Sequence, residues 1–383
     1  AHSERRFTLD GDDVLEERLA RLCEKVLAGV RDLVPQEKLE ALVLGGGYGR
    51  GQGGVLKTPA GDAPYNDLEF YVFLRGNRVL NERKFAVALN QLGERLSPEA
   101  GLHVEFKIDS LARLRQSPVS MFSYDLVCGH RVVFGDEHAF DGCEHHRDAQ
   151  KIPLAEATRL LFNRCTGLLL AKEYLRKSAL SVDEADFVGR NIAKAQLGIG
   201  DAVLAAVGKY HWSVLERRRA LEELAPLDGF IWLPEVKHHH AAGVQFKLHP
   251  QQIAMPLDAF QAEHEAVSKL ARHVWLWLEG RRLQRTFSSA HEYAFSDVTK
   301  CAGSPVWRNV LLQAKTFGAA SVCDGAVTRY PRERLLNALP LLLWDEPLND
   351  TKVKDHIQKQ LRTGAPDWQG LVAAYKAVWP KFS

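Results

Sequence analysis

The chain has 383 residues, of which 46% are hydrophobic and 26% charged, and its formal net charge at neutral pH is +2. This composition is typical of a soluble globular protein, and the length is sufficient for two domains that each bury a core. The near-neutral charge excludes a global electrostatic drive toward nucleic acid or acidic membranes, whereas a local basic groove for nucleic acid would not show in the total. No apolar run is long enough to span a bilayer, which predicts no membrane partner.

The cysteines give an expectation about the compartment. The chain has six of them, at positions 23, 128, 143, 165, 301 and 323, and no pair has the CxxC spacing of a metal or redox site. Scattered cysteines of this kind indicate reduced thiols that are mostly buried. The sequence therefore predicts a cytoplasmic protein.

The first 142 residues alternate helical and extended patterns. Apolar side chains recur at three- and four-residue spacing in two segments, and short apolar or alternating runs occur in four others. We expect helices at 13–34 and 84–96, and strands at 41–46, 67–74, 102–108 and 130–135. Helices interleaved with strands predict a layered α/β domain with a short mixed sheet over residues 1–142.

The pattern becomes helical after this point. Helical periodicity marks residues 154–175, 191–210, 213–224, 265–283 and 332–344. Between them, residues 237–250 and 301–309 are rich in histidine, glycine or proline, and we expect loops there. The sequence thus predicts an α+β protein with an all-helical second domain over residues 150–383.

A glycine-rich segment follows the strand predicted at 41–46, and two nucleotide-binding architectures fit it. Gly49, Gly51 and Gly54 match the G-x-G-x-x-G fingerprint of dinucleotide-binding folds, and Glu69 lies at the distance expected of its ribose-binding acid. That fingerprint requires a helix directly after the glycines. Residues 54–66 instead contain two prolines and further glycine, which predicts a loop, and Glu69 opens a strand rather than closing one. The context excludes the dinucleotide interpretation.

The second interpretation depends on acidic residues. Asp67 and Glu69 are two residues apart on a predicted strand, so their side chains share one face. Two adjacent carboxylates repel each other unless a cation holds them, and Mg²⁺ is the usual choice where phosphates are bound. Glu105, on the strand at 102–108, is the candidate third carboxylate, with Asp109 as the alternative. A solvent-facing acid on an edge strand is the competing interpretation of Glu105.

Taken together, these residues resemble the DNA polymerase β-like nucleotidyltransferase superfamily over residues 40–136. The resemblance is carried by Gly46 and Gly47, by Arg50, by the Asp67-Leu68-Glu69 triplet that opens a strand, and by Glu105 between apolar neighbours. The sequence GGYGRG is similar to the corresponding turn of bacterial uridylyltransferases. The D-x-E triplet is like that of aminoglycoside nucleotidyltransferases.

The resemblance implies a role for each matched residue. Gly46, Gly47 and Arg50 would bind the phosphates of a nucleoside triphosphate. The carboxylates Asp67, Glu69 and Glu105 would bind two Mg²⁺ ions, with Glu105 alternatively acting as the base for the acceptor hydroxyl. The helical half resembles substrate-binding bundles only in general character, and we expect Lys194 there to contact the nucleotide. Arg190, Asp201 and Tyr210 are further candidates for lining the acceptor site.

The function predicted from these residues is Mg²⁺-dependent nucleotidyl transfer from an NTP to a hydroxyl, first on a small molecule. A macromolecular acceptor, either protein or tRNA, is the second alternative, and a non-catalytic nucleotide-binding protein is the third. Residues 54–66 form a longer loop than compact members of the superfamily have, which suggests a lid or a substrate-selecting flap. His238, His239 and His240 are expected to lie in a solvated loop rather than at a metal.

Overall fold

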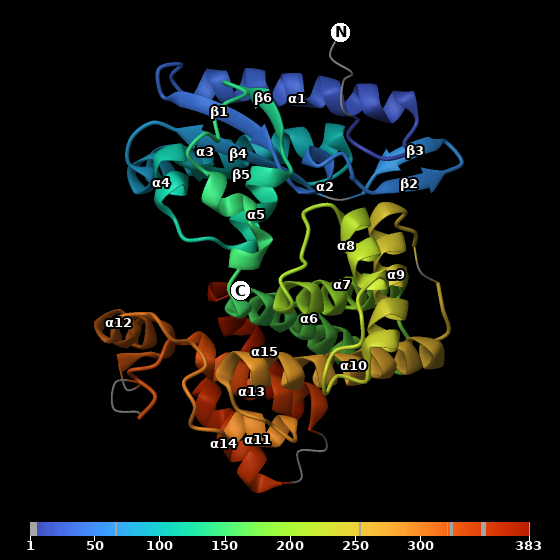
Figure 1. Cartoon of the computed structure of the whole chain (residues 1–383), viewed down its shortest axis with the longest axis vertical. Coiled ribbons are helices and arrows are strands. Elements are labelled where there is room, and N and C mark those ends of the chain that lie inside the picture. Colours follow the sequence, from blue (N-terminus) through green and yellow to red (C-terminus); the bar gives the residue numbers. More distant parts are fainter. Residues whose placement is uncertain are drawn as a thin grey trace. The chain divides into compact units, whose positions relative to one another are not determined.

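A computed structural model describes residues 6–65, 67–252, 254–319, 321, 325–345 and 350–382. The chain divides into two compact units, each of which is assembled from separate stretches of sequence. The first unit comprises Ala1–Glu156, Val207–Leu224 and Val244–Gln252; the second comprises Ala157–Ala206, Ala225–Gly243 and Ile253–Ser383. The predicted α+β class is confirmed, because a small mixed sheet is combined with a helical C-terminal region (Figure 1). Two stretches that the sequence places among the C-terminal helices, 207–224 and 244–252, cluster with the first unit.

The first unit contains a four-stranded mixed sheet in the order β5-β4-β1-β6. Its strands are β1 (Leu39–Leu44), β4 (Leu68–Leu74), β5 (Val104–Asp109) and β6 (Arg131–Phe134). Strand β1 pairs antiparallel with both β4 and β6, whereas β4 and β5 are parallel. All four strands overlap the predicted ranges, although β1 ends two residues before the predicted range does. This topology brings the end of β1 and the beginnings of β4 and β5 to one end of the sheet.

The prediction of a loop at 54–66 is wrong, because most of these residues form a β-hairpin. Strands β2 (Val55–Thr58) and β3 (Gly61–Pro64) pair antiparallel, and Lys57 Nζ lies 2.7 Å from Asp62 Oδ2 across the pair. Proline disfavours the interior of a sheet but is tolerated on a two-stranded ribbon, where its missing N–H can face solvent. Gly61 has a φ of +118°, which suits the tight turn between the strands.

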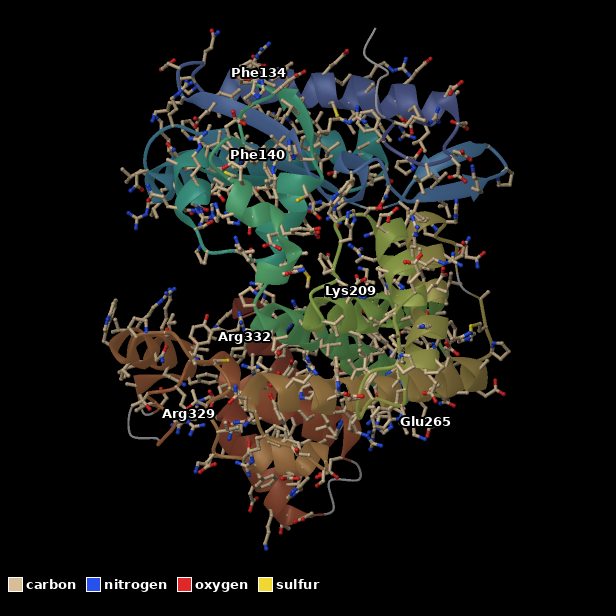
Figure 2. The ribbon with its side chains drawn as sticks, in the orientation of Figure 1. Phe134, Phe140, Lys209, Glu265, Arg329 and Arg332 are labelled. Atoms are coloured by element: carbon tan, nitrogen blue, oxygen red, sulfur yellow. The ribbon has the colours of Figure 1, made fainter. Side chains whose placement is uncertain are left out.

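Helices cover both faces of the sheet. In this unit they are α1 (Asp13–Leu33), α2 (Gly46–Gly49), α3 (Arg78–Ala100), α4 (Leu111–Gln116), α5 (Met121–Cys128) and α8 (Val214–Glu222), with short 3₁₀ turns at Glu144–Arg147 and Ala149–Lys151. Because strand side chains alternate, Phe70 and Val72 join the core under α1 and α3, whereas Tyr71 and Phe73 join the core under α4 and α5. Figure 2 labels Phe140, whose ring meets that of Phe73 edge-on at 5.7 Å.

Specific polar contacts fix the later stretches to the first unit. Ser213 caps the N-terminus of α8, and its hydroxyl accepts a hydrogen bond from the Gln52 side chain at 2.6 Å. The same Gln52 amide accepts the Val214 N–H at 2.8 Å. Near the start of the other stretch, the ring of Phe246 meets that of Tyr65 edge-on at 6.0 Å. The loop after α2 is thereby held by a helix distant in sequence.

Among the described residues of the second unit, the regular elements are helices, and an isolated β-bridge joins Leu227 and Phe230. The helices are α6 (Leu154–Leu175), α7 (Val182–Ala206), α9 (Leu233–Leu248), α10 (Leu257–Leu283), α11 (Ala290–Phe295), α12 (Val306–Phe317), α13 (Arg332–Trp344), α14 (Thr351–Leu361) and α15 (Trp368–Val378), with a 3₁₀ turn at Trp379–Lys381. Both α6 and α9 cross the division between the units. The prediction of a loop at 237–250 is wrong, since most of these residues belong to α9. The last residues of the loop predicted at 301–309 form the first turn of α12.

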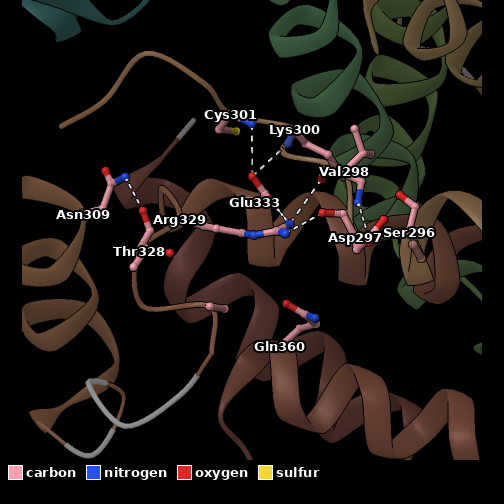
Figure 3. A network of polar contacts seen from close by, with 12 residues as sticks. Ser296, Asp297, Val298, Lys300, Cys301, Asn309, Thr328, Arg329, Glu333 and Gln360 are labelled. Carbon is pink, nitrogen blue, oxygen red and sulfur yellow. Dashed lines mark hydrogen bonds and ion pairs between the residues drawn. The ribbon is translucent and has the colours of Figure 1, made fainter. Parts of the chain in front are cut away.

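A buried acid organises part of this unit (Figure 3). Glu333, on α13, is only 2% exposed and accepts hydrogen bonds from the backbone N–H groups of Lys300 and Cys301 at 2.9 and 3.1 Å. Arg329 pairs with the same carboxylate and donates to the carbonyls of Asp297 and Val298. The network ties the segment after α11 to α13.

Among the described helices, none combines the length and apolar character needed to cross a bilayer.

Candidate functional site

The glycine turn after β1 packs directly on β4. The Gly45 N–H donates to the Glu69 carbonyl at 2.9 Å, and a Cβ at Gly45 would lie 2.5 Å from Cε2 of Tyr71. Gly46 has a φ of +62°, and a Cβ there would lie 3.6 Å from the Glu69 carboxyl group. At Gly47, a Cβ would lie 3.1 Å from the Gln52 carbonyl. These glycines let the backbone approach Glu69 and Tyr71 closely.

The structure brings together two of the three predicted carboxylates. Glu69 on β4 and Glu105 on β5 are register partners in the parallel ladder, so both side chains lie on the face covered by α4 and α5. Lys107 lies on the same face, with Nζ 3.7 Å from Glu69 Oε2 and 3.4 Å from Glu105 Oε2. The three side chains are between 34% and 42% exposed. The result is a cation held between two carboxylates at the edge of the solvent.

A buried tyrosine orients one of these acids. The Tyr71 hydroxyl donates to Glu69 Oε2 at 2.8 Å. Burial is the main cause that raises the pKa of Tyr71, followed by the negative charge of Glu69. The phenol therefore remains protonated and acts as a donor at neutral pH. The positive charge of Arg50 acts on the same phenol in the opposite sense, which places Arg50 within the field of this site.

The remaining acidic candidates are placed differently. Asp67 is exposed and lies immediately before β4. Asp109, the alternative third carboxylate, is buried and forms a two-point pair with Arg113, at 2.7 Å to Nε and 2.6 Å to Nη2. Because Asp109 is occupied by Arg113, Glu105 is the acid of β5 that faces Glu69. The sequence prediction grouped Asp67, Glu69 and Glu105; the register of β4 and β5 places Glu69 beside Glu105.

Whether these residues fit Mg²⁺ can be judged from what they already hold. Within the described ranges, no group of three or more His, Cys, Asp or Glu side chains is gathered as a metal site would require. The pair Glu69 and Glu105 nevertheless holds a cationic group, the Lys107 ammonium, between one oxygen of each. Mg²⁺ is often bound by one or two carboxylates and completed by substrate phosphates and water. The pair offers one carboxylate oxygen from each strand for such an ion, at the place where the Lys107 ammonium lies.

Arg50 contacts an acid of α5 and a main-chain carbonyl. It is the C-cap of α2, and its Nη2 lies 3.3 Å from Asp125 Oδ2 on α5. Its Nη1 donates to the Trp212 carbonyl at 3.2 Å. The Tyr210 hydroxyl donates to the same Asp125 oxygen at 3.1 Å, and the buried Arg217 donates to that hydroxyl at 3.1 Å. Arg50 and Tyr210 thus meet at Asp125, within the first unit.

The other predicted residues lie in the second unit. Lys194 is exposed on α7, where Arg190 pairs with a neighbouring acid one turn earlier. Asp201 is buried, and its Oδ1 lies 3.0 Å from Nε2 of His240. The prediction that the three histidines lie in a solvated loop is wrong, because all three belong to helix α9 and His240 is only 1% exposed. His239 contacts the Gln196 side chain at 3.1 Å. Helix packing, rather than metal binding, accounts for these two histidines.

A cavity of about 380 Å³ adjoins the carboxylate pair. Both Tyr71 and Lys107 line it, together with side chains of β5, α3, α4 and α5. Sequence reasoning missed these two residues, although a signal was present. Each follows a predicted acid by two residues, so the period of a strand places Tyr71 beside Glu69 and Lys107 beside Glu105.

The candidate site thus consists of a glycine turn, two carboxylates, a lysine that bridges them and a tyrosine that orients one of them. These groups come from two neighbouring strands, β4 and β5, and from the turn that follows β1. A scan against protein-family models finds no match for this chain, and a search of curated proteins finds no significant match.

Proposed function

We propose that this protein transfers a nucleotidyl group from a nucleoside triphosphate to an acceptor hydroxyl, with Mg²⁺. One observation carries the proposal: Glu69 and Glu105 are register partners on parallel strands and face each other beside the turn that contains Gly45 and Gly46. Paired carboxylates next to a close backbone approach are what a metal-assisted phosphate site needs. The Lys107 ammonium lies between the same two carboxylates, at the place that a metal ion would take.

The proposed reaction assigns a task to each residue. The acceptor oxygen attacks the α-phosphorus and forms a new P–O bond, while the bond between the α-phosphorus and the bridging oxygen breaks and pyrophosphate leaves. Glu105 accepts the proton of the acceptor hydroxyl. Tyr71 holds Glu69 in place through its hydrogen bond, and Lys107 balances negative charge that develops on the leaving group. Bound Mg²⁺ would supply further neutralisation of the triphosphate.

The proposal leaves the acceptor and the nucleotide base open at this site. The sequence favours a small-molecule acceptor first and a protein or tRNA second, and the same chemistry at Glu105 serves each of them. Catalysis in this scheme comes mainly from positioning and from charge neutralisation. Arg50, which pairs with Asp125, contributes through its charge.

A second candidate function is favoured by the position of Lys107. Its ammonium lies within 4 Å of both carboxylates and balances part of their charge without any metal. A permanent lysine at this place would suit a protein that binds a nucleotide and does not transfer it. In that case, the fold would serve recognition, and nucleotide binding would be independent of Mg²⁺.

The test of the proposed function is a transfer assay. The full chain is incubated with Mg²⁺ and each α-³²P-labelled NTP, with cell extract as the source of acceptors. We expect label in an acceptor with the wild-type protein and with Glu94→Gln, an exposed acid on α3 that serves as the matched control. Glu69→Gln and Glu105→Gln should each abolish transfer. Nucleotide binding that is independent of Mg²⁺, with no transfer by any of the proteins, would support the second candidate and count against the first.

A further inference from the structure

Strand β5 is an edge of the sheet, and its free side can be identified from two hydrogen bonds. The Leu68 N–H donates to the His103 carbonyl at 2.9 Å, so odd-numbered residues here bond toward β4. The Val104 N–H donates to Ser97 Oγ at 3.0 Å, which shows that Val104 points away from β4. Main-chain groups of a parallel strand alternate in direction. The N–H and C=O groups of Phe106 and Ile108 therefore point away from the sheet.

The cavity beside the carboxylate pair lies over this free side. It is lined by four consecutive residues of β5, from Phe106 to Asp109, whose side chains alternate between the two faces of the sheet. A cavity that meets both faces of one strand must lie over the edge of that strand. Within the described part of the chain, no side chain or loop hydrogen-bonds to the main chain of Phe106 or Ile108 from outside the sheet.

The walls of the cavity differ on the two faces. On one face, Leu89 and Ala86 of α3 form an apolar wall next to Phe106. On the other face are Tyr71 and Lys107, which also belong to the carboxylate site. A strand added along β5 would send alternate side chains to these two walls. Apolar side chains suit the first wall, and hydroxyl side chains on the second wall would point toward Glu105.

The charges in the cavity argue against an ionic ligand. Arg113 is paired with Asp109, and Arg78 is paired with Glu82 at 2.7 Å, so these groups neutralise each other. What the edge offers instead is a row of main-chain donors and acceptors. Because a neighbouring strand satisfies such a row, an extended main chain is the ligand that this edge fits.

We propose that an extended polypeptide segment, with apolar residues alternating with serine, threonine or tyrosine, binds as an added strand along the free edge of β5. Given the proposed nucleotidyl transfer, on which this second step rests, a hydroxyl of that segment is the acceptor. The transfer forms an ester bond between that side-chain oxygen and the α-phosphorus, releases pyrophosphate and passes the hydroxyl proton to Glu105. The acceptor is thereby a polypeptide rather than a free small molecule.

Binding is tested with a defined probe and the full chain, without nucleotide or Mg²⁺. The probe is a fluorescein-labelled peptide with alternating Val and Ser between charged ends, followed by fluorescence anisotropy. Two analogues carry N-methyl groups, one on every Val amide and the other on every Ser amide. The amides of alternate residues point to opposite edges of a strand. We expect one analogue to lose at least ten-fold in affinity and the other to bind within about two-fold of the parent.

The sensitive analogue also reports the direction of the added strand. Val side chains against α3 put the Val amides toward β5 in an antiparallel pair, and the Ser amides toward β5 in a parallel pair. A peptide of the same composition with all Val residues adjacent should bind at least ten-fold more weakly. No binding by the alternating peptide, or equal affinity of the two methylated analogues, would overturn the proposal.

A variant of the protein gives an independent reading. Ile108→Pro removes an N–H that points outward and leaves the ladder to β4 intact, as proline on an edge strand can. If the variant folds by circular dichroism, it should bind the peptide at least five-fold more weakly; if it does not fold, the analogues decide alone. Peptide binding without any transfer would count against the proposed function only, and transfer to another acceptor without peptide binding would count against this inference only.

Discussion

Replacing Lys107 by methionine tests the idea that its ammonium occupies the place of a metal ion. Methionine retains an unbranched side chain of similar length and removes the charge. In the protein, Lys107 Nζ lies 3.7 Å from Glu69 Oε2 and 3.4 Å from Glu105 Oε2. A divalent cation that binds the two carboxylates must displace this ammonium. We therefore expect Lys107→Met to bind such a cation more tightly than the wild type.

The size of the effect follows from the two ion pairs. At these distances, and with the dielectric constant of water, each pair contributes about 1 kcal/mol. All three side chains are between 34% and 42% exposed, so solvent and salt screen the attraction, and measured values for exposed pairs are about 0–1 kcal/mol. We take about 1–2 kcal/mol for the two pairs together. Loss of that competition lowers the dissociation constant of the metal by about five- to thirty-fold.

The assay is a titration of the full chain with Mn²⁺ in place of Mg²⁺, in which free Mn²⁺ is counted by electron paramagnetic resonance. Lys57→Met is the matched control, since Lys57 is also a strand lysine paired with an acid, Asp62, but lies in the β2–β3 hairpin. The control should bind Mn²⁺ like the wild type, and Glu69→Gln should bind it more weakly than either. Equal or weaker binding by Lys107→Met, with the other two variants behaving as expected, would refute the competition.

Three further outcomes can be measured on the same protein. In Gly45→Ala the new methyl group would lie 2.5 Å from Cε2 of Tyr71, so the ring must move and Mn²⁺ binding should weaken in the titration above. Glu333→Ala leaves Arg329 without its buried partner, and urea unfolding should show a loss of about 3–5 kcal/mol; a loss below about 1 kcal/mol would contradict the assigned role. Burial lowers the pKa of Lys300 from 10.5 to about 8, so unfolding takes up a proton between these pH values and wild-type stability should rise through that window. Relative to Lys300→Met, the wild type should therefore gain stability from about pH 7 to about pH 10, and a constant difference would contradict this.

The parts of the fold that the sequence predicts are those with a local cause. Strands β1, β4, β5 and β6 each carry an apolar run or an alternation that survives in the structure, and α1 and α3 carry a three- and four-residue repeat. The predicted helices at 154–175, 213–224 and 332–344 likewise correspond to α6, α8 and α13. In these segments, the spacing of the apolar residues within the element is enough to show which face is buried.

The predictions of secondary structure fail where contacts with residues distant in sequence determine the conformation. Residues 237–250 look like a loop because of their histidines and glycine, yet most of them belong to α9. His240 is buried there against Asp201, and a Cβ at Gly243 would lie 2.4 Å from the Leu197 backbone nitrogen. Both contacts are made with α7, so the helix is stabilised by a partner about forty residues away in sequence. Nothing within the segment itself reveals that partner.

The candidate site also has a part that the local sequence predicts and a part that depends on distant strands. The two-residue period predicts that Glu105 and Lys107 share a face, and it places Glu69 and Tyr71 together. Which residue of β5 lies opposite Glu69 depends on the register of two strands that are separated by the whole of α3. A shift of one residue would turn Glu105 toward α3 and away from Glu69. The pairing of the acids is thus a property of the assembled sheet.

Main-chain bonds hold that register on both sides of β4 near the acids. On one side the Gly45 N–H donates to the Glu69 carbonyl, and on the other the Leu68 N–H donates to the His103 carbonyl, both at 2.9 Å. Substitution of the acidic side chains leaves these bonds in place, so the backbone positions of residues 69 and 105 should survive in the corresponding variants. Loss of activity in Glu69→Gln or Glu105→Gln with unchanged unfolding would therefore report on the chemistry of the carboxylates rather than on the fold. The same reasoning makes Lys107→Met informative. The substitution removes the positive charge of the lysine, while the sheet keeps the separation of the two carboxylates unchanged.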